Sequence, residues 1–221
     1  DFSSMYFYTP DDNIDTVRLS EYAKKVEAEY ATKIGHVYYA LDTNYSKAIE
    51  SYNRSIELNP SGYYVSDNYY FIGQAYFAQD SFLKVITSYN KCMDLEPGFS
   101  DDFLLNYQLG FSYAKQGDYP KAIALYEKAI KINSNTGYVF YNLGYAYYVQ
   151  ESYSDAIASF KKAIKLDTSS AGSYYYMGSS YSAQRKYPKA IKEFEKCMDL
   201  YSEPEPFLLI SLANAYYNNA I

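Results

Sequence analysis

The sequence predicts an all-α protein, an α-solenoid of five helix-turn-helix repeats followed by half of a sixth. Three observations support this fold class: short motifs recur every 34 residues, apolar residues within each period follow helical spacing, and no segment shows a convincing strand pattern. The composition agrees, because 48% of the 221 residues are hydrophobic and the chain is long enough to bury a row of small cores.

The period is clearest in the second half of the chain. Gly110, Gly144 and Gly178 follow one another at intervals of 34 residues (144 − 110 = 34 and 178 − 144 = 34). Each glycine is followed by a tyrosine after three residues, an alanine after twelve, an aromatic residue after sixteen and a small residue after nineteen. These columns are Tyr113, Tyr147 and Tyr181; Ala122, Ala156 and Ala190; Tyr126, Phe160 and Phe194; and Ala129, Ala163 and Cys197.

Two further blocks precede these three. Gly73 begins a matching block, but the next glycine follows after 37 residues (110 − 73 = 37), so three extra residues fall in the loop at 97–102. Gly35 begins the first block, where one extra residue lies in the turn at 42–44. At the far end the pattern restarts at 212–216, which makes the last unit a half repeat.

Within a block the apolar residues predict two amphipathic helices. Phe140, Leu143 and Tyr147 are spaced by three and four residues, as expected of one face of a helix. Gly117 supplies a turn between two such helices, and Pro120 suits the first turn of the second. Since one helix pair cannot bury its apolar face alone, neighbouring pairs must stack.

The pattern L-G-x-x-Y … A-x-x-x-F/Y-x-x-A … P with this period resembles the tetratricopeptide repeat family, from Ala28 to Ile221. The resemblance implies a right-handed superhelix. Two departures are visible: the closing proline is missing after the last three complete repeats, and the family's early tryptophan is replaced. The replacing residues are Tyr69, Asn106, Phe140 and Tyr174.

Because the resemblance begins at Ala28, we divide the chain into a lead-in with a capping helix at 1–27 and the repeat solenoid at 28–221. The approximate repeats are 28–65, 66–102, 103–136, 137–170 and 171–205, with a partial repeat at 206–221. In the lead-in, residues 9–12 form a turn signal, and from Ile14 the spacing predicts a helix that continues into the first repeat.

Charge and composition exclude several classes of function. A formal charge of −6 and a pI near 4.9 argue against nucleic acid, which needs a basic face. No stretch approaches the roughly 18 apolar residues of a membrane span, so none is predicted. The sequence leaves the compartment open between the cytoplasm and an exported or periplasmic location, because the chain starts at Asp1 and a signal segment could have been removed.

The sequence offers no catalytic or metal-binding constellation. His36 is the only histidine, and a lone histidine has no partner set for a metal site or a nucleophile–base pair. Cys92 and Cys197 are the only cysteines and share the small-residue column, which predicts two reduced core residues. No phosphate-binding glycine loop is found. We therefore predict a non-enzyme without cofactor.

The resemblance implies that the first helix of each pair lines a concave face where peptide ligands lie. On that face we predict a tyrosine-rich peptide-binding groove. Its residues are Tyr70, Gln74, Phe77, Tyr107, Phe111, Tyr138, Tyr141, Asn142, Tyr145, Tyr148 and Tyr175. Tyrosine suits such a surface because each ring buries much apolar area and keeps a polar hydroxyl. That some of these rings belong to the core stays an open alternative.

One subtype of the family can be excluded. Chaperone-binding members carry a carboxylate clamp of lysine, arginine and asparagine. Asn142 matches one clamp position, but the flanking positions hold Tyr107, Phe111, Gly172 and Tyr176, which are not cations.

The leading hypothesis is a non-catalytic scaffold that binds a peptide or protein segment in this groove. A second hypothesis is self-assembly into a homo-oligomer through the unpaired terminal helix at 206–219. A third is a carbohydrate or small amphiphile stacked on the tyrosines.

Overall fold

The computed structural model describes residues 16–41, 43–201, 203 and 205–220, and these residues form an all-helical chain. Its α-helices are α1 (Thr16–Ala40), α2 (Tyr45–Leu58), α3 (Val65–Ala78), α4 (Phe82–Leu95), α5 (Phe103–Lys115), α6 (Tyr119–Ile132), α7 (Gly137–Val149), α8 (Tyr153–Leu166), α9 (Ala171–Ala183), α10 (Tyr187–Met198) and α11 (Pro206–Asn219). A short 3-10 helix, Pro97–Asp101, occupies the predicted insertion between α4 and α5.

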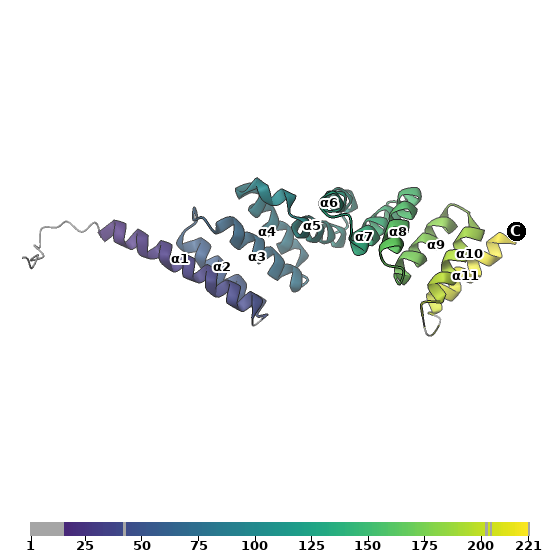
Figure 1. The fold of residues 1–221 in the computed structure, drawn as a ribbon, viewed down its shortest axis with the longest axis horizontal. Helices are drawn as coiled ribbons and strands as arrows, with labels where there is room; N and C mark the ends of the chain where they lie inside the picture. Colours follow the sequence, from purple (N-terminus) through teal and green to yellow (C-terminus); the bar gives the residue numbers. More distant parts are fainter. Residues whose placement is uncertain (1–15, 42, 202, 204, 221) are drawn as a thin grey trace, which may run out of the picture.

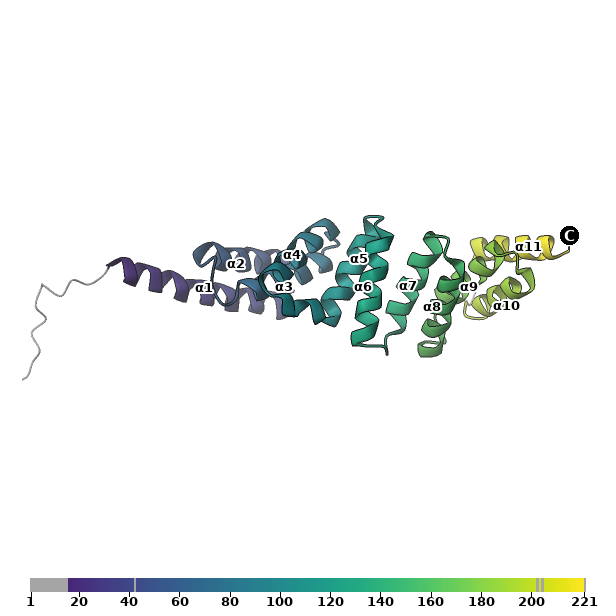
Figure 2. The same cartoon turned by 90° about the horizontal axis from the view of Figure 1, so that it is seen from above.

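The helices stack as pairs in one elongated row, from α1/α2 to α9/α10, with α11 at the end (Figure 1). Each even-numbered helix also contacts the next odd-numbered one, so the core runs along the array. From α3 onward each odd-numbered helix also contacts the next odd-numbered helix, so these helices lie on the inside of the curve of the solenoid. Figure 2 shows the same row of helices from above. The predicted right-handed α-solenoid is confirmed.

The first helix is longer than the others. α1 runs without interruption for 25 residues from Thr16 to Ala40, whereas the other helices have 12 to 14. It crosses residue 27, where the sequence places the limit between capping helix and solenoid. The predicted turn at 9–12 and the predicted start at Ile14 lie outside the described residues.

The glycine column brings helices into close contact inside each repeat. A methyl group at Gly144 would lie 2.7 Å from Cε1 of Phe160, and one at Gly73 would lie 2.5 Å from Cε1 of Tyr89. Both rings are fully buried. The aromatic column therefore occupies the space that a side chain on the glycine would need.

The repeats also share a backbone conformation in the turn between their two helices. The residue seven positions after the repeat glycine has a positive φ in four repeats, at Asp80, Gly117, Glu151 and Arg185. A left-handed backbone suits glycine, but only Gly117 meets that preference. The predicted turn at Gly117 is thus one instance of a turn that the other repeats form with non-glycine residues.

Both cysteines are buried and unpaired by a disulfide. Burial raises the pKa of the Cys92 thiol to about 12 and that of Cys197 to about 11. Because the thiolate is the reactive form, these thiols act as small core side chains.

Candidate binding groove

The predicted groove residues lie on the odd-numbered helices α3, α5, α7 and α9, on the inside of the curve. Tyr138 is the most open of them, with 47% of its surface exposed. The others are half-buried. Their rings pack against one another into two clusters, and each ring keeps part of its surface exposed.

The first cluster joins α3, α5 and α7. The ring of Phe77 lies 5.5 Å from that of Phe111, and Tyr107 lies 4.8 Å from Tyr138 in an edge-to-face arrangement. Such pairs stabilise a surface beyond the area they bury. Phe82, at the start of α4, completes this cluster with a ring 5.7 Å from Phe111.

The second cluster joins α7 and α9 and is centred on Tyr176. Its ring lies 5.0 Å from Tyr145, 5.3 Å from Tyr148 and 5.1 Å from Tyr175. The ring of Tyr141 also belongs to this cluster and lies 6.3 Å from that of Tyr176. The cluster continues to α11, because Tyr175 lies 5.0 Å from Phe207.

Two predicted residues at the N-terminal end are held by polar contacts. Gln74 accepts a hydrogen bond of 2.8 Å from the hydroxyl of Tyr39 on α1. The hydroxyl of Tyr70 donates to Oδ1 of Asp102 at 3.3 Å, and burial together with that carboxylate raises the pKa of Tyr70 to about 12. This end of the groove is therefore more polar than the part lined by α7 and α9.

The single histidine also lies at this end and is held in place. Its Nδ1 lies 2.9 Å from the hydroxyl of Tyr52, and its ring meets the ring of Phe71 edge to face at 4.6 Å. Burial lowers the pKa of His36, which favours the neutral ring.

Three hydroxyl groups of the second cluster have no hydrogen-bond partner among the described residues: those of Tyr141, Tyr145 and Tyr176. Among the described residues Asn106 Oδ1 is the one buried side-chain polar atom without a partner. The three hydroxyl oxygens are therefore not fully buried. Burial, together with the neighbouring tyrosines, raises the pKa of Tyr176 to about 12. The cluster thus presents neutral phenols that can donate hydrogen bonds.

Asn142 has a structural contact rather than a free amide. Its Nδ2 donates to the carbonyl oxygen of Tyr138 at 2.9 Å, one turn back on α7. The amide therefore bonds within α7 itself.

The tyrosine column of the repeat has a different, structural role. Lysine Nζ lies 5.0 Å above the ring of Tyr76, 4.9 Å above Tyr113 and 5.8 Å above Tyr181, from the second helix of the same repeat. In the fourth repeat an aspartate replaces this lysine, and the Tyr147 hydroxyl donates instead to Glu127 at 2.7 Å. These contacts tie helices together and separate the structural tyrosines from those of the groove.

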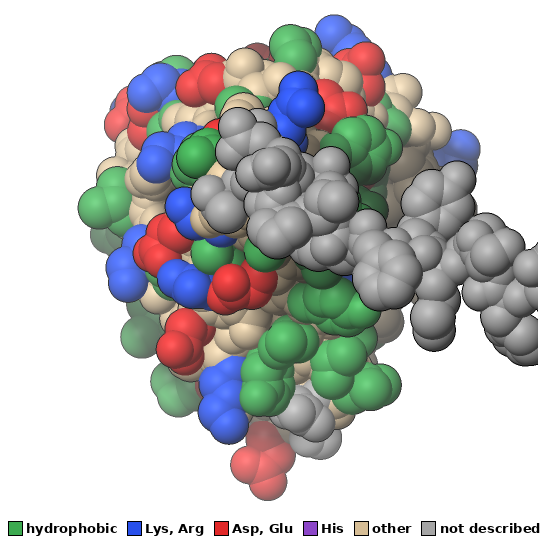
Figure 3. All heavy atoms as spheres, turned by 90° about the vertical axis from the view of Figure 1, so that its left-hand side faces the viewer, with side chains coloured by type: hydrophobic (Ala, Val, Ile, Leu, Met, Phe, Trp, Pro, Cys, Tyr) green, Lys and Arg blue, Asp and Glu red, His purple; other side chains and the backbone are tan. Residues whose placement is uncertain are grey.

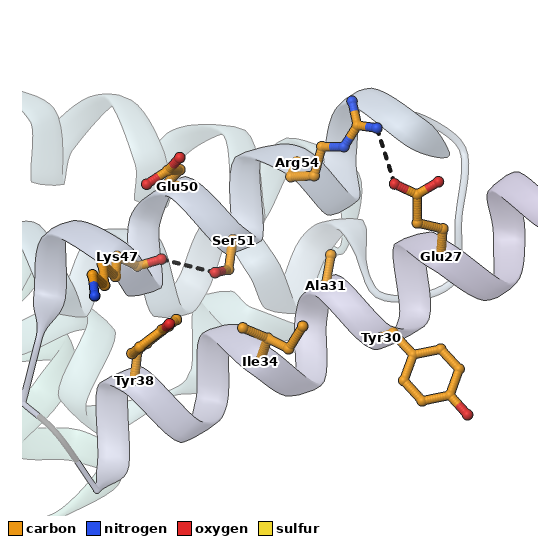
Figure 4. A pocket seen from close by; sticks show the side chains of 9 residues that line it. All are labelled: Glu27, Tyr30, Ala31, Ile34, Tyr38, Lys47, Glu50, Ser51 and Arg54. Atoms are coloured by element: carbon orange, nitrogen blue, oxygen red, sulfur yellow. Dashed lines mark hydrogen bonds and ion pairs between the residues drawn. The ribbon is translucent and has the colours of Figure 1, made fainter.

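A pocket of about 420 Å³ lies away from the groove, between α1 and α2 (Figure 4). Apolar side chains of α1 form its floor, and an ion pair of 2.9 Å between Glu27 and Arg54 closes one side. Among the described residues no group of three or more histidine, cysteine or acidic side chains could hold a metal ion. No described helix is long and apolar enough to cross a membrane.

Sequence reasoning missed Tyr176, the centre of the second cluster. It lies two residues before its repeat glycine, in the same column as Asn142 and Phe71. Because Asn142 was selected from that column, the same position in the next repeat could have been found.

The fold defines a helical repeat protein whose odd-numbered helices carry clusters of packed aromatic side chains. Family models described as tetratricopeptide repeat match residues 28–61 and 66–99, and 173–203. A model described as TPR repeat matches 110–151 and 144–184. The chain belongs to the tetratricopeptide repeat family.

Comparison with solved structures agrees on the fold. YrrB, described as a TPR protein with an unusual peptide-binding site, has a TM-score of 0.72 at 18% identity, covering 93% of this chain and 97% of its own. MamA from Desulfovibrio magneticus RS-1 has 0.67 at 20%, covering 79% and 94%. A tetratricopeptide repeat protein from Parabacteroides merdae has 0.68 at 15%, covering 88% and 74%. The comparison with curated protein sequences found no match.

Proposed function

We propose that the chain is a non-catalytic scaffold that binds a segment of a partner protein in the aromatic groove of α3, α5, α7 and α9. The observation that carries the proposal is the second cluster, where half-buried rings are packed in place and three hydroxyls are left without internal partners. Rings that are already ordered lose little side-chain entropy on binding, which favours affinity. The peptide-binding site in the name of YrrB, a protein of similar fold, supports the same class of ligand.

The chemistry of the groove limits what the ligand can be. Aromatic faces bury apolar side chains, and phenol hydroxyls can donate to the main-chain carbonyls of an extended segment. Lys115 borders the first cluster, with its Nζ 5.1 Å above the ring of Phe111. Because few of the groove residues are charged, binding of the partner should depend only weakly on salt concentration.

A capture experiment tests the proposal. The full chain is immobilised, and proteins retained from an extract of its source cells are quantified by mass spectrometry at two salt concentrations. Tyr138→Ala combined with Tyr145→Ala removes two rings that face the groove, and we expect at least a tenfold loss of the specific partner, because aromatic anchors dominate such interfaces. Tyr141 is kept, since its ring also packs 6.1 Å from the buried Phe160.

The matched control is Tyr63→Ala combined with Leu83→Ala, which removes two apolar side chains that are exposed elsewhere. The control should keep the wild-type melting temperature, and the groove variant, which loses two packed rings, should still be fully folded at the temperature of the capture experiment. Equal retention of the partner by the groove variant and the control contradicts the proposal. A hydroxyl-only variant, Tyr145→Phe with Tyr176→Phe, then measures how much binding depends on hydrogen bonds.

A further inference from the structure

A continuous apolar stripe runs along the outer side of α1. Its members recur at intervals of four and three residues, which places them within one face of a helix of 3.6 residues per turn. They are Leu19, Ala23, Val26, Tyr30, Ile34, Val37 and Leu41. All but the half-buried Val26 are exposed. Figure 3 looks at this end of the molecule and shows hydrophobic side chains gathered on part of it.

The equivalent positions are buried in every other complete repeat. Ile34 is 49% exposed, whereas its counterparts Ile72, Leu109, Leu143 and Met177 are 2–6% exposed. Val37 is likewise 49% exposed where the counterparts are fully buried. In those repeats the preceding even-numbered helix covers the face. The stripe on α1 is thus a stacking face of the solenoid on which no described helix lies.

α1 begins well before the position at which the first helix of the later repeats begins. In the later repeats a connection of a few residues joins an even-numbered helix to the next odd one, as from Ile132 to Gly137. The corresponding residues before Ala28 are helical back to Thr16. Between Thr16 and Ala28 the described chain therefore makes no short turn of the kind that joins two helices in the later repeats.

The stripe is also nearly symmetrical about its centre. Counting outward from Tyr30, Val26 matches Ile34, and Leu19 matches Leu41, with Ala23 and Val37 between. A pattern that reads similarly in both directions is complementary to an antiparallel copy of itself, as an isologous twofold interface requires. We propose that α1 is the interface of a homodimer, in which two copies of this stripe pack antiparallel about a twofold axis near Tyr30.

Charge and space beside the stripe fit this arrangement. Lys33 pairs with Glu29 at 2.7 Å on the same helix, and both are exposed. Such pairs contribute little, so they can exchange partners across the axis at small cost. The pocket between α1 and α2 opens next to Tyr30 and Ile34, which leaves room for side chains of the second copy (Figure 4).

The terminal helix α11 is a weaker candidate for self-association. It also exposes apolar residues, among them Ile210 and Tyr217. Its exposed positions are interrupted by Asn214 and Asn218, and the helix has 14 residues against 25 in α1. The α1 stripe is longer and carries its own symmetry.

Dimerisation through α1 leaves the groove free. Tyr39 lies nine residues after Tyr30, about half a turn further round the helix at 3.6 residues per turn, and it faces Gln74 in the groove. A dimer therefore presents two grooves, so a partner with two binding segments gains avidity. This inference does not depend on the identity of the groove ligand.

Sedimentation velocity of the full chain tests the dimer. The chain mass is 25.5 kDa, so we expect a species of about 51 kDa at micromolar concentration, twice that value. Tyr30→Lys with Val37→Lys should sediment as a monomer with an unchanged circular dichroism spectrum, because it places two like charges at the axis and one more about 10 Å to either side of it. Ile210→Lys is the control and should remain dimeric. A monomeric wild type, or dissociation by Ile210→Lys alone, overturns the proposal.

Cysteine cross-linking tests the symmetry independently. Tyr30→Cys should form a disulfide-linked dimer under mild oxidation, because a residue on a twofold axis meets its own copy, and the two native thiols are buried. Leu19→Cys should not cross-link alone, since antiparallel copies separate it from its counterpart by about 33 Å at 1.5 Å per residue. Mixed with Leu41→Cys it should form a heterodimer. Self-cross-linking of Leu19→Cys, or none by Tyr30→Cys, overturns the antiparallel arrangement.

Discussion

Phe160→Ala is expected to lower the free energy of unfolding by about 3–5 kcal/mol, the usual cost of removing a fully buried aromatic ring. The Phe160 side chain is 0% exposed. Its ring stacks on that of Tyr176 at 6.1 Å and lies against Gly144. The loss therefore removes the packing inside repeat four and the contact with repeat five together.

Urea denaturation followed by circular dichroism measures this effect, and hydrogen exchange locates it. Because a solenoid is held together by contacts between neighbours, protection should fall first in α7–α10. Tyr63→Ala, at a side chain 86% exposed, is the control and should change stability by less than about 0.5 kcal/mol. Similar stability losses in the two variants would show that the aromatic column does not hold the repeats.

Gly73→Ala is expected to cost about 1–3 kcal/mol even though alanine is the better helix former, since the site is already filled. The added methyl would lie 2.5 Å from Tyr89 Cε1 and 2.7 Å from Cδ1. Tyr89 is fully buried and its hydroxyl donates to Gln108, so the ring cannot move aside without losing that bond.

Gly98→Ala is the matched control, because nothing lies within 4 Å of the position its methyl would take. Thermal unfolding of both variants by differential scanning calorimetry compares them directly. A Gly73→Ala protein as stable as Gly98→Ala would show that the close approach of the helices is not required.

The fold was predictable because the repeat columns carry it. A glycine and an aromatic residue occur sixteen positions apart in three consecutive repeats, and the structure brings each such pair into contact, as with Gly144 and Phe160. The positive φ of Glu151 and Arg185 was not predictable, since neither residue favours a left-handed backbone, whereas Asp80 is of a type that adopts it more often.

The sequence pattern predicts which helix face the proposed groove residues share, but it does not predict which side chains they contact. Tyr141 and Tyr145 are equivalent in the helical pattern, but the ring of Tyr141 packs 6.1 Å from that of the buried Phe160, whereas the ring of Tyr145 packs 5.0 Å from that of Tyr176. The exposed face of α1 was also hidden, because Ile34 occupies a column that is buried in the later repeats. Both differences depend on neighbours, which a pattern within one helix does not contain.

Site-specific photo-cross-linking tests the central claim most directly, that a partner segment binds on the inside of the curve. A photoreactive phenylalanine analogue replaces Tyr145 on α7 in one protein and the exposed Leu83 on α4 in another, and each is irradiated in an extract of the source cells. The groove predicts a discrete adduct from position 145 that Tyr138→Ala abolishes, and none from position 83. The same adduct from position 83, or no adduct from position 145, would contradict it.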